Sequence, residues 1–201
     1  MKKILTTLVI GTGLLLSGCS NVDSALTMGD TKITTQELQL NVDAILAERA
    51  GVDTSQMQLE YGETLMRNQL QFQLLLAGFA EIAKDLKIEI TNSEIAARRS
   101  EIVESVGGES GLPQALVSAS IAQADLDGYL RAILTTEKLG QALIQTGTAE
   151  ADVQDRIQQL FISKVTELKL NVNPRYGKWD ATTGQIVAAQ VASDAVTPAN
   201  E

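Results

Sequence analysis

The stretch LQFQLLLAGF, residues 70–79, is apolar at every position except two glutamines and one glycine. Apolar residues recur at helical spacing on both sides of it, which predicts a long helix over residues 55–86. A membrane span would need an uninterrupted apolar run of about 18 residues, and charged Arg67 and Glu81 flank this run too closely. We therefore expect a helix buried in the core of a globular domain, weakened or bent at Gly78.

Two capping boxes predict where two further helices begin, one framed by Thr34 and Glu37 and the other by Thr91 and Glu94. In each box a hydroxyl and a carboxylate satisfy backbone N–H groups that the first helical turn leaves free. Apolar periodicity predicts later helices over residues 112–117, 126–143 and 153–165. The first helix should end before residue 51 and should bury one face. That face carries Leu38, Val42, Ile45 and Leu46.

The two ends of the domain carry strand signals. Residues 25–33 alternate weakly around the turn Gly29-Asp30 and predict a small hairpin. After Glu167 the apolar period changes from helical to two, which predicts a half-buried strand. Its core-facing residues are Leu168, Leu170 and Val172. We expect this strand to pair with the hairpin, giving a mostly α, α+β domain whose first and last elements meet.

The segment 173–180 follows the predicted strand and is expected to close the sheet. The alternative is that Tyr176 and Trp179 mark a ligand surface. Beyond it, residues 181–201 contain no aromatic residue and few branched aliphatic ones. This composition predicts a mobile C-terminal tail, with local structure at most around Ile186-Val187.

The first 19 residues resemble a bacterial lipoprotein signal. Lys2 and Lys3 precede an apolar run over residues 4–16, and Ser17-Gly18 then lead into Cys19, the only cysteine of the chain. The resemblance implies cleavage before Cys19, lipidation of that residue and anchoring on the extracytoplasmic side of a membrane. The alternative is an ordinary signal peptide with an incidental cysteine. The expected organisation is a signal over 1–18, a tether over 19–24, one domain over 25–180 and a tail over 181–201.

Composition excludes several classes of function. The net charge of −9 becomes −11 once Lys2 and Lys3 leave with the signal, and an acidic surface argues against nucleic-acid binding. The chain has no histidine, which excludes Ser-His-Asp and Cys-His catalysis and zinc sites built on Cys and His. We therefore expect no catalytic residue, no cofactor and no metal site, and we do not expect an enzyme.

Charged residues at helical spacing are expected to be solvent-exposed. Glu60 with Glu63, and Glu101 with Glu104, have the i,i+3 spacing that would bring two carboxylates together on a helix. Such pairs are far more often solvated faces than acid–base pairs. The same interpretation applies to Arg98-Arg99.

Four segments, taken in order, resemble motifs of the SurA-like and PrsA-like secretion chaperones. They are residues 33–38 (ITTQEL), 82–95 (IAKDLKIEITNSEI), 120–131 (SIAQADLDGYLR) and 172–180 (VNPRYGKWD). The resemblance covers residues 26–180, nearly the whole mature chain. The closing segment and the order of the four are more specific than the capping boxes, which are common. The implied fold is the helical SurA N-terminal-like domain.

The chain departs from that family at two places. Ser120 stands where a glycine is usual, and Ala122 stands where a capping serine or threonine is expected. Full-length relatives insert a parvulin-type prolyl isomerase domain between the long helices and the closing strand. Residues 146–152 leave no room for one here. The resemblance therefore implies the chaperone module without the isomerase.

By this resemblance, the expected function is a lipid-anchored chaperone or holdase. It would bind unfolded or partly folded exported polypeptides reversibly in an apolar groove between helices, without cofactor or chemistry. The alternative, from another class, is a structural or assembly lipoprotein that recruits one folded partner. The two differ in promiscuity, because a holdase binds many unfolded chains and an adaptor binds one folded protein.

Overall fold

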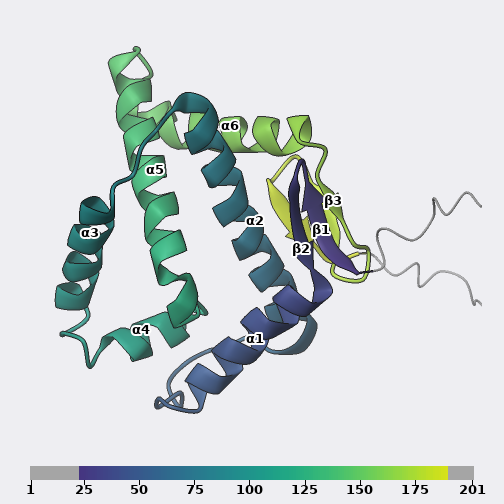
Figure 1. The fold of residues 1–201 in the computed structure, drawn as a ribbon, viewed down its shortest axis with the longest axis vertical. Helices are drawn as coiled ribbons and strands as arrows, with labels where there is room; N and C mark the ends of the chain where they lie inside the picture. Colours follow the sequence, from purple (N-terminus) through teal and green to yellow (C-terminus); the bar gives the residue numbers. More distant parts are fainter. Residues whose placement is uncertain (1–22, 190–201) are drawn as a thin grey trace, which may run out of the picture.

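The computed structural model describes residues 23–189. In this part of the chain, six α-helices and two small antiparallel sheets confirm the predicted mostly helical α+β fold (Figure 1). The helices are α1 (Thr35–Arg49), α2 (Gly62–Leu86), α3 (Asn92–Ser105), α4 (Leu112–Ala119), α5 (Leu126–Gln145) and α6 (Val153–Glu167). The strands are β1 (Ser24–Met28), β2 (Thr31–Thr34), β3 (Asn171–Val172), β4 (Lys178–Asp180) and β5 (Gln185–Val187). Single 3₁₀ turns, Gln123–Asp125 and Glu150–Asp152, precede α5 and α6.

Both capping boxes start helices as predicted. The Glu37 N–H donates to Thr34 Oγ1 at 3.0 Å, and the Thr34 N–H donates to Glu37 Oε2 at 2.7 Å. The same reciprocal pair joins Thr91 and Glu94 at the start of α3. One expectation for α1 is wrong, because Leu46 is 40% exposed. Its place on the buried face is taken by the aliphatic stem and guanidinium of Arg49, which is only 7% exposed.

The long helix α2 begins later than the sequence predicts. Residues 55–61 form a loop, and the helix starts at Gly62 after an extended Tyr61 that provides no side-chain cap. It ends as expected at Leu86, where Lys87 takes a left-handed conformation with φ of 55°. One consequence is that Glu60 and Glu63 do not share a helix face, since only Glu63 is helical.

The expected pairing between the two ends of the chain is confirmed. β1 is the central strand of a three-stranded sheet ordered β2-β1-β3, in which Leu26 lies opposite Ile33 and Val172. The pairing strand is shorter than predicted, because Lys169 has a positive φ of 54° and interrupts the extended backbone after α6. Leu168 and Leu170 lie in this turn, yet both still pack against the core.

The local structure allowed for at Ile186-Val187 is present as β5, but it belongs to the folded domain, so the predicted mobile tail does not begin at residue 181. β4 and β5 form a second antiparallel sheet in which Trp179 pairs with Ile186. Ile186 is 5% exposed and belongs to the main core. Gln71 of α2 fixes the hairpin, because its Oε1 accepts from the Ile186 N–H at 2.7 Å and its Nε2 donates to the Gly184 carbonyl. Residues 190–201 lie outside the described part of the chain.

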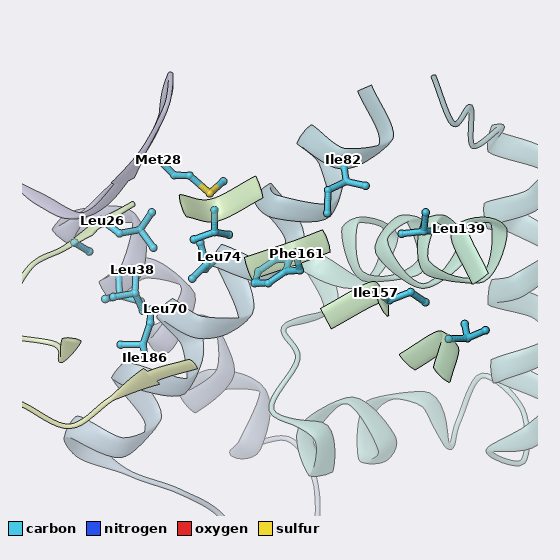
Figure 2. Packing of buried hydrophobic residues seen from close by; sticks show 13 residues of the cluster. Leu26, Met28, Leu38, Leu70, Leu74, Ile82, Leu139, Ile157, Phe161 and Ile186 are labelled. Atoms are coloured by element: carbon cyan, nitrogen blue, oxygen red, sulfur yellow. The ribbon is translucent and has the colours of Figure 1, made fainter. Parts of the chain in front are cut away.

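The main core lies between the sheets, α2 and α6 (Figure 2). Its buried members include residues of β1, α1, α2, α5, α6 and β5. Phe161 of α6 packs directly onto the backbone of α2 at Gly78, and a Cβ at position 78 would collide with the ring. Gly78 lies within the continuous helix α2, and its lack of a side chain lets α2 and α6 approach closely.

A second core cluster joins α3, α4 and α5. Its buried residues are Ile95, Leu112, Leu116, Ile121, Leu126, Leu130 and Leu134. In Figure 1, α5 lies between α3 and α2. Leu126, Leu130 and Leu134 recur every four residues on one face of α5, so this face packs on the α3 side. The neighbouring face of α5 is thereby left to meet α2.

Candidate functional site

An apolar groove runs between α2 and α5. It has a volume of about 230 Å³ and is lined mainly by half-buried apolar side chains. The lining residues are Phe72, Leu75, Leu76 and Phe79 of α2, and Tyr129, Ala132, Ile133, Thr136 and Glu137 of α5. Because these carbons are neither fully packed nor paired with polar atoms, the groove is suited to burying an apolar group of another molecule.

Helical periodicity explains how the groove forms. On α2, residues 72, 75, 76 and 79 follow the i, i+3, i+4, i+7 pattern of one helix face. Leu70, Leu74 and Gly78 lie on a different face, which is fully buried against the main core. The stretch 70–79 therefore carries two apolar faces, of which one builds the core and the other remains half-exposed.

Aromatic rings define one end of the groove. The Phe72 and Tyr129 rings lie 6.0 Å apart with a tilt of 43°, so the two helices touch there through an aromatic pair. Close by, Gln73 Nε2 donates to Asp125 Oδ2 at 3.2 Å and ties α2 to the turn that starts α5. Burial raises the pKa of Asp125, and the hydrogen bond from Gln73 opposes that rise.

Glu137 at the other end of the lining is held by an arginine from α3. Arg98 Nη1 and Nη2 each donate to a different oxygen of Glu137 at 2.7 Å, the bidentate geometry that guanidinium and carboxylate favour. The charged rim is therefore fixed in place instead of being free to fold over the apolar carbons. Arg98 was expected on a solvated helix face; it is partly exposed there, and its side chain in addition joins α3 to α5.

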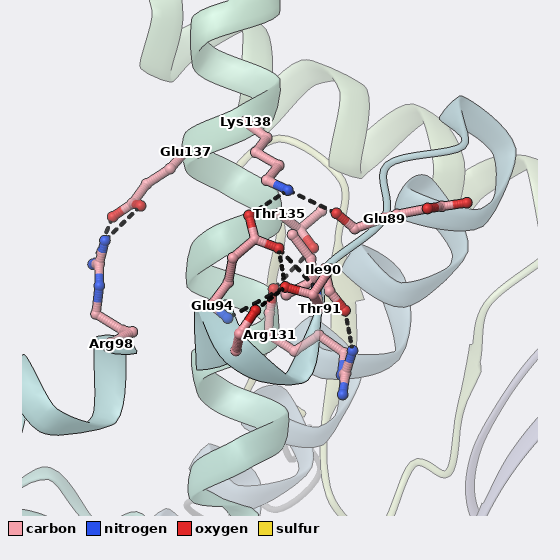
Figure 3. A network of polar contacts seen from close by, with 10 residues as sticks. Glu89, Ile90, Thr91, Glu94, Arg98, Arg131, Thr135, Glu137 and Lys138 are labelled. Atoms are coloured by element: carbon pink, nitrogen blue, oxygen red, sulfur yellow. Dashed lines mark hydrogen bonds and ion pairs between the residues drawn. The ribbon is translucent and has the colours of Figure 1, made fainter. Parts of the chain in front are cut away.

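Further polar contacts attach α3 to α5 (Figure 3). Lys138 of α5 bonds Glu94 Oε1 at 2.7 Å and the Glu89 carbonyl at 2.7 Å, while Arg131 donates to the Ile90 carbonyl at 2.9 Å. The hydrogen bond from Lys138, together with those from Thr91, lowers the pKa of Glu94 from 4.5 to about 2. The carboxylate that caps α3 is thus the same one that binds α5.

A polar pocket adjoins the groove, because Phe72 lines both. It has a volume of about 310 Å³, and its other lining residues are Gln58, Glu60, Asn68, Gln69, Ser118, Ala119 and Ser120. Ser120 has a left-handed φ of 53°, a conformation that favours glycine. Its hydroxyl accepts a hydrogen bond from buried Arg49 at 3.1 Å, so the serine provides a contact that glycine would lack.

The structure places the site residues predicted from the sequence in different environments. Cys19 lies outside the described residues. Glu101 and Glu104 are exposed on α3, as expected of a solvated face. Trp179 is half-buried and packs on Phe161 at 6.4 Å, as expected of a residue that closes the fold. Tyr176 is likewise half-buried and packs against the main core, and it also lines a surface pocket, so the alternative of a ligand surface stays a prediction.

Residues 23–189 contain neither a group of three or more acidic or cysteine side chains placed to hold a metal ion nor a helix long and apolar enough to cross a membrane. The groove residues Tyr129 and Ile133 were expected to be core. They form a second apolar stripe on α5, displaced around the helix from the stripe of Leu126, Leu130 and Leu134. A single sequence does not show which of two apolar stripes faces the core.

None of the protein-family models, curated proteins and solved structures compared with this chain matches it. The resemblance to SurA-like and PrsA-like chaperones therefore stays a prediction from the sequence motifs.

Proposed function

We propose that this protein is a lipid-anchored extracytoplasmic holdase that binds unfolded exported polypeptides and has no isomerase activity. The observation that carries the proposal is the half-exposed apolar groove between α2 and α5, lined by Phe72, Leu76, Tyr129 and Ile133 among others. Alkyl and aromatic side chains attract any apolar segment in proportion to the area buried, about 25 cal/mol per Å². Such a surface favours varied clients over one specific ligand.

The size of the groove favours weak, reversible binding. Its volume of about 230 Å³ is below the range of roughly 300–1,000 Å³ typical of pockets that enclose a whole small molecule. It can therefore take apolar side chains of a longer chain while the rest of that chain stays outside. Ordering a disordered client offsets much of the gain, which keeps the affinity modest.

Charge adds a preference among clients. The mature chain is expected to carry a net charge of −11. Basic and neutral unfolded chains should associate faster than acidic ones, and the difference should shrink as salt screens the field.

Membrane attachment at Cys19 is the other half of the proposal, and the signal-like residues 2–19 support it. Cell fractionation of a Cys19→Ala variant tests it directly. The variant should leave the membrane fraction, and retention through detergent-free washes would refute anchoring by a lipid.

The holdase activity is tested by light scattering from several denatured proteins diluted with and without the lipid-free domain. We expect delayed aggregation of unrelated clients near stoichiometric ratios, and loss of this effect in a Leu76→Asn/Ile133→Asn variant. The matched control is Leu40→Asn/Ile144→Asn, which adds the same polar groups at residues that are exposed outside the groove. Equal holdase activity of the two variants would refute the groove as the client-binding site. No effect on any client, together with tight binding to one folded protein, would favour the adaptor.

A further inference from the structure

Another pocket is lined by two arginines whose guanidinium groups form no ion pair and no hydrogen bond with the described residues. Arg67 of α2 and Arg175 of the β3–β4 loop line the same cavity, which has a volume of about 560 Å³. Among residues 23–189, these are the two arginines whose guanidinium groups have neither an ion pair nor a hydrogen bond. Arg67 Nε is moreover buried without any partner.

The environment of these arginines is suited to an oxyanion. Arg175 lies over the Tyr176 ring at 5.9 Å, and Met66 and Pro174 provide apolar walls. Glu63 is the one acidic residue among the lining residues, and it pairs with neither arginine. A phosphate group offers oxygen acceptors to the planar guanidinium groups of arginines such as the two that line this cavity.

The pocket lies beside the point where the chain enters from its tether. Asn173, which directly precedes the lining residue Pro174, donates from its side chain to the Ser24 carbonyl and from its backbone to the Ala25 carbonyl, both at 2.9 Å. Cys19 precedes Ser24 by five residues, and a fully extended chain of that length spans at most about 18 Å. An anchor at Cys19 therefore keeps this side of the domain near the headgroups of the membrane.

We propose that the cavity between Arg67 and Arg175 binds the phosphate group of a membrane phospholipid. This inference rests on the proposed anchoring, which brings the pocket to the headgroups. It adds a second contact that orients the domain. Along α2, residue 76 in the middle of the groove lies nine positions beyond Arg67, about 14 Å at 1.5 Å per residue. The groove is thereby displaced from the headgroups along the helix and remains open to clients.

Vesicle partitioning of the mature chain carrying Cys19→Ser tests the proposal without the lipid anchor. Phosphatidylglycerol vesicles should bind the protein, and vesicles of an uncharged glycolipid without phosphate should not. An Arg67→Gln/Arg175→Gln variant should lose about 30-fold in partitioning, since each arginine near an anionic surface contributes about fivefold. Arg156→Gln/Lys84→Gln has the same net charge, lies outside the pocket and should change partitioning less than about twofold.

Four results would overturn the proposal. They are no binding to phosphatidylglycerol vesicles, equal binding to the phosphate-free vesicles, equal losses in the two double variants, and binding of soluble glycerol phosphate without binding of vesicles. The last result would assign the pocket to a free phosphate compound. Because this assay omits the anchor, it fails or succeeds independently of the fractionation of Cys19→Ala.

Discussion

The two sides of the molecule are held together by different forces. The sheet region, made of β1–β5, α2 and α6, is joined by buried apolar side chains around Phe161, Leu70 and Leu74. The helical arm, made of α3, α4 and α5, has its own smaller apolar cluster, but α3 is also attached to α5 by partly exposed charges. Stability of the sheet region should therefore respond to volume changes, and attachment of α3 should respond to salt and pH.

This difference matters for the groove, because α2 belongs to the sheet region and α5 belongs to the arm. One wall is fixed by a core that excludes water, and the other is held from behind by ion pairs such as Arg98–Glu137. The two walls therefore belong to different core clusters, although Leu139 of α5 also reaches the main core.

The largest expected effect is in the sheet region. Phe161→Ala removes a ring that is 4% exposed and touches Gly78, Phe79 and Trp179, so it should lower the free energy of unfolding by about 3–5 kcal/mol. Urea unfolding followed by the fluorescence of Trp179, the only tryptophan, measures it. Leu160→Ala on the exposed side of α6 should cost about 0.5 kcal/mol or less. Comparable losses of unfolding free energy in the two variants would contradict the assignment of Phe161 to the core.

Gly78→Ala tests the close packing of α6 on α2 by adding a methyl group. Alanine favours a helix by about 1 kcal/mol over glycine, yet here its Cβ would meet the buried Phe161 ring. Overpacking should prevail and destabilise the fold by about 1–3 kcal/mol. A double variant, Gly78→Ala/Phe161→Leu, should recover part of the loss in urea unfolding. A stabilised Gly78→Ala protein would show that α2 and α6 lie further apart.

The arm should respond to smaller, electrostatic changes. A double-mutant cycle with Arg98→Ala and Glu137→Ala should give a coupling of about 0.2–1 kcal/mol, because both side chains are partly exposed. The coupling should decline between 0.05 and 1 M salt, since screening weakens exposed pairs. The effect of Phe161→Ala should not decline with salt. A coupling independent of salt would mean that the pair is held away from solvent.

The smallest expected effect is the pH dependence at Glu94. Its pKa in the fold is lowered from 4.5 to about 2, so the unfolded state takes up the proton first as pH falls. The stabilisation is complete above about pH 4.5 and is lost as pH falls toward 2. Urea midpoints between pH 6 and 2 should fall less steeply in Glu94→Gln than in the wild type. Glu104→Gln removes the same charge from exposed α3 and is the control, and identical profiles of the two variants would contradict the prediction.

Local signals in the sequence located the helix starts that depend on local chemistry. The capping boxes at Thr34 and Thr91 are complete within four residues, so they are readable from the sequence and correct in the structure. The start of α2 was missed because Tyr61 provides no side-chain cap, and apolar periodicity alone extends backward into the loop. The pairing of β1 with β3 was predictable because the change of period after Glu167 is itself local.

Features that depend on distant partners were not predictable from the sequence. The role of Arg98 depends on Glu137, which lies 39 residues away on another helix. β5 is stabilised by Gln71, 115 residues before Ile186, so its short apolar segment resembled a tail. A groove between helices was expected, but its lining could not be located for a related reason, since Tyr129 and Leu130 are neighbours in one apolar stretch and only the packing of α2, α3 and α4 buries one more than the other.

The central position of β1 in its sheet imposes an order of events on folding. A chain is synthesised from its N-terminal end, so β1 can pair with β2 early, whereas its other neighbour at Val172 arrives near the end. Until then, one edge of β1 has no partner, and Phe161 and Ile186 are not yet present to complete the core. The domain therefore remains incompletely folded through most of its own synthesis. During that interval it has the same exposed apolar surface that it is proposed to cover in other chains.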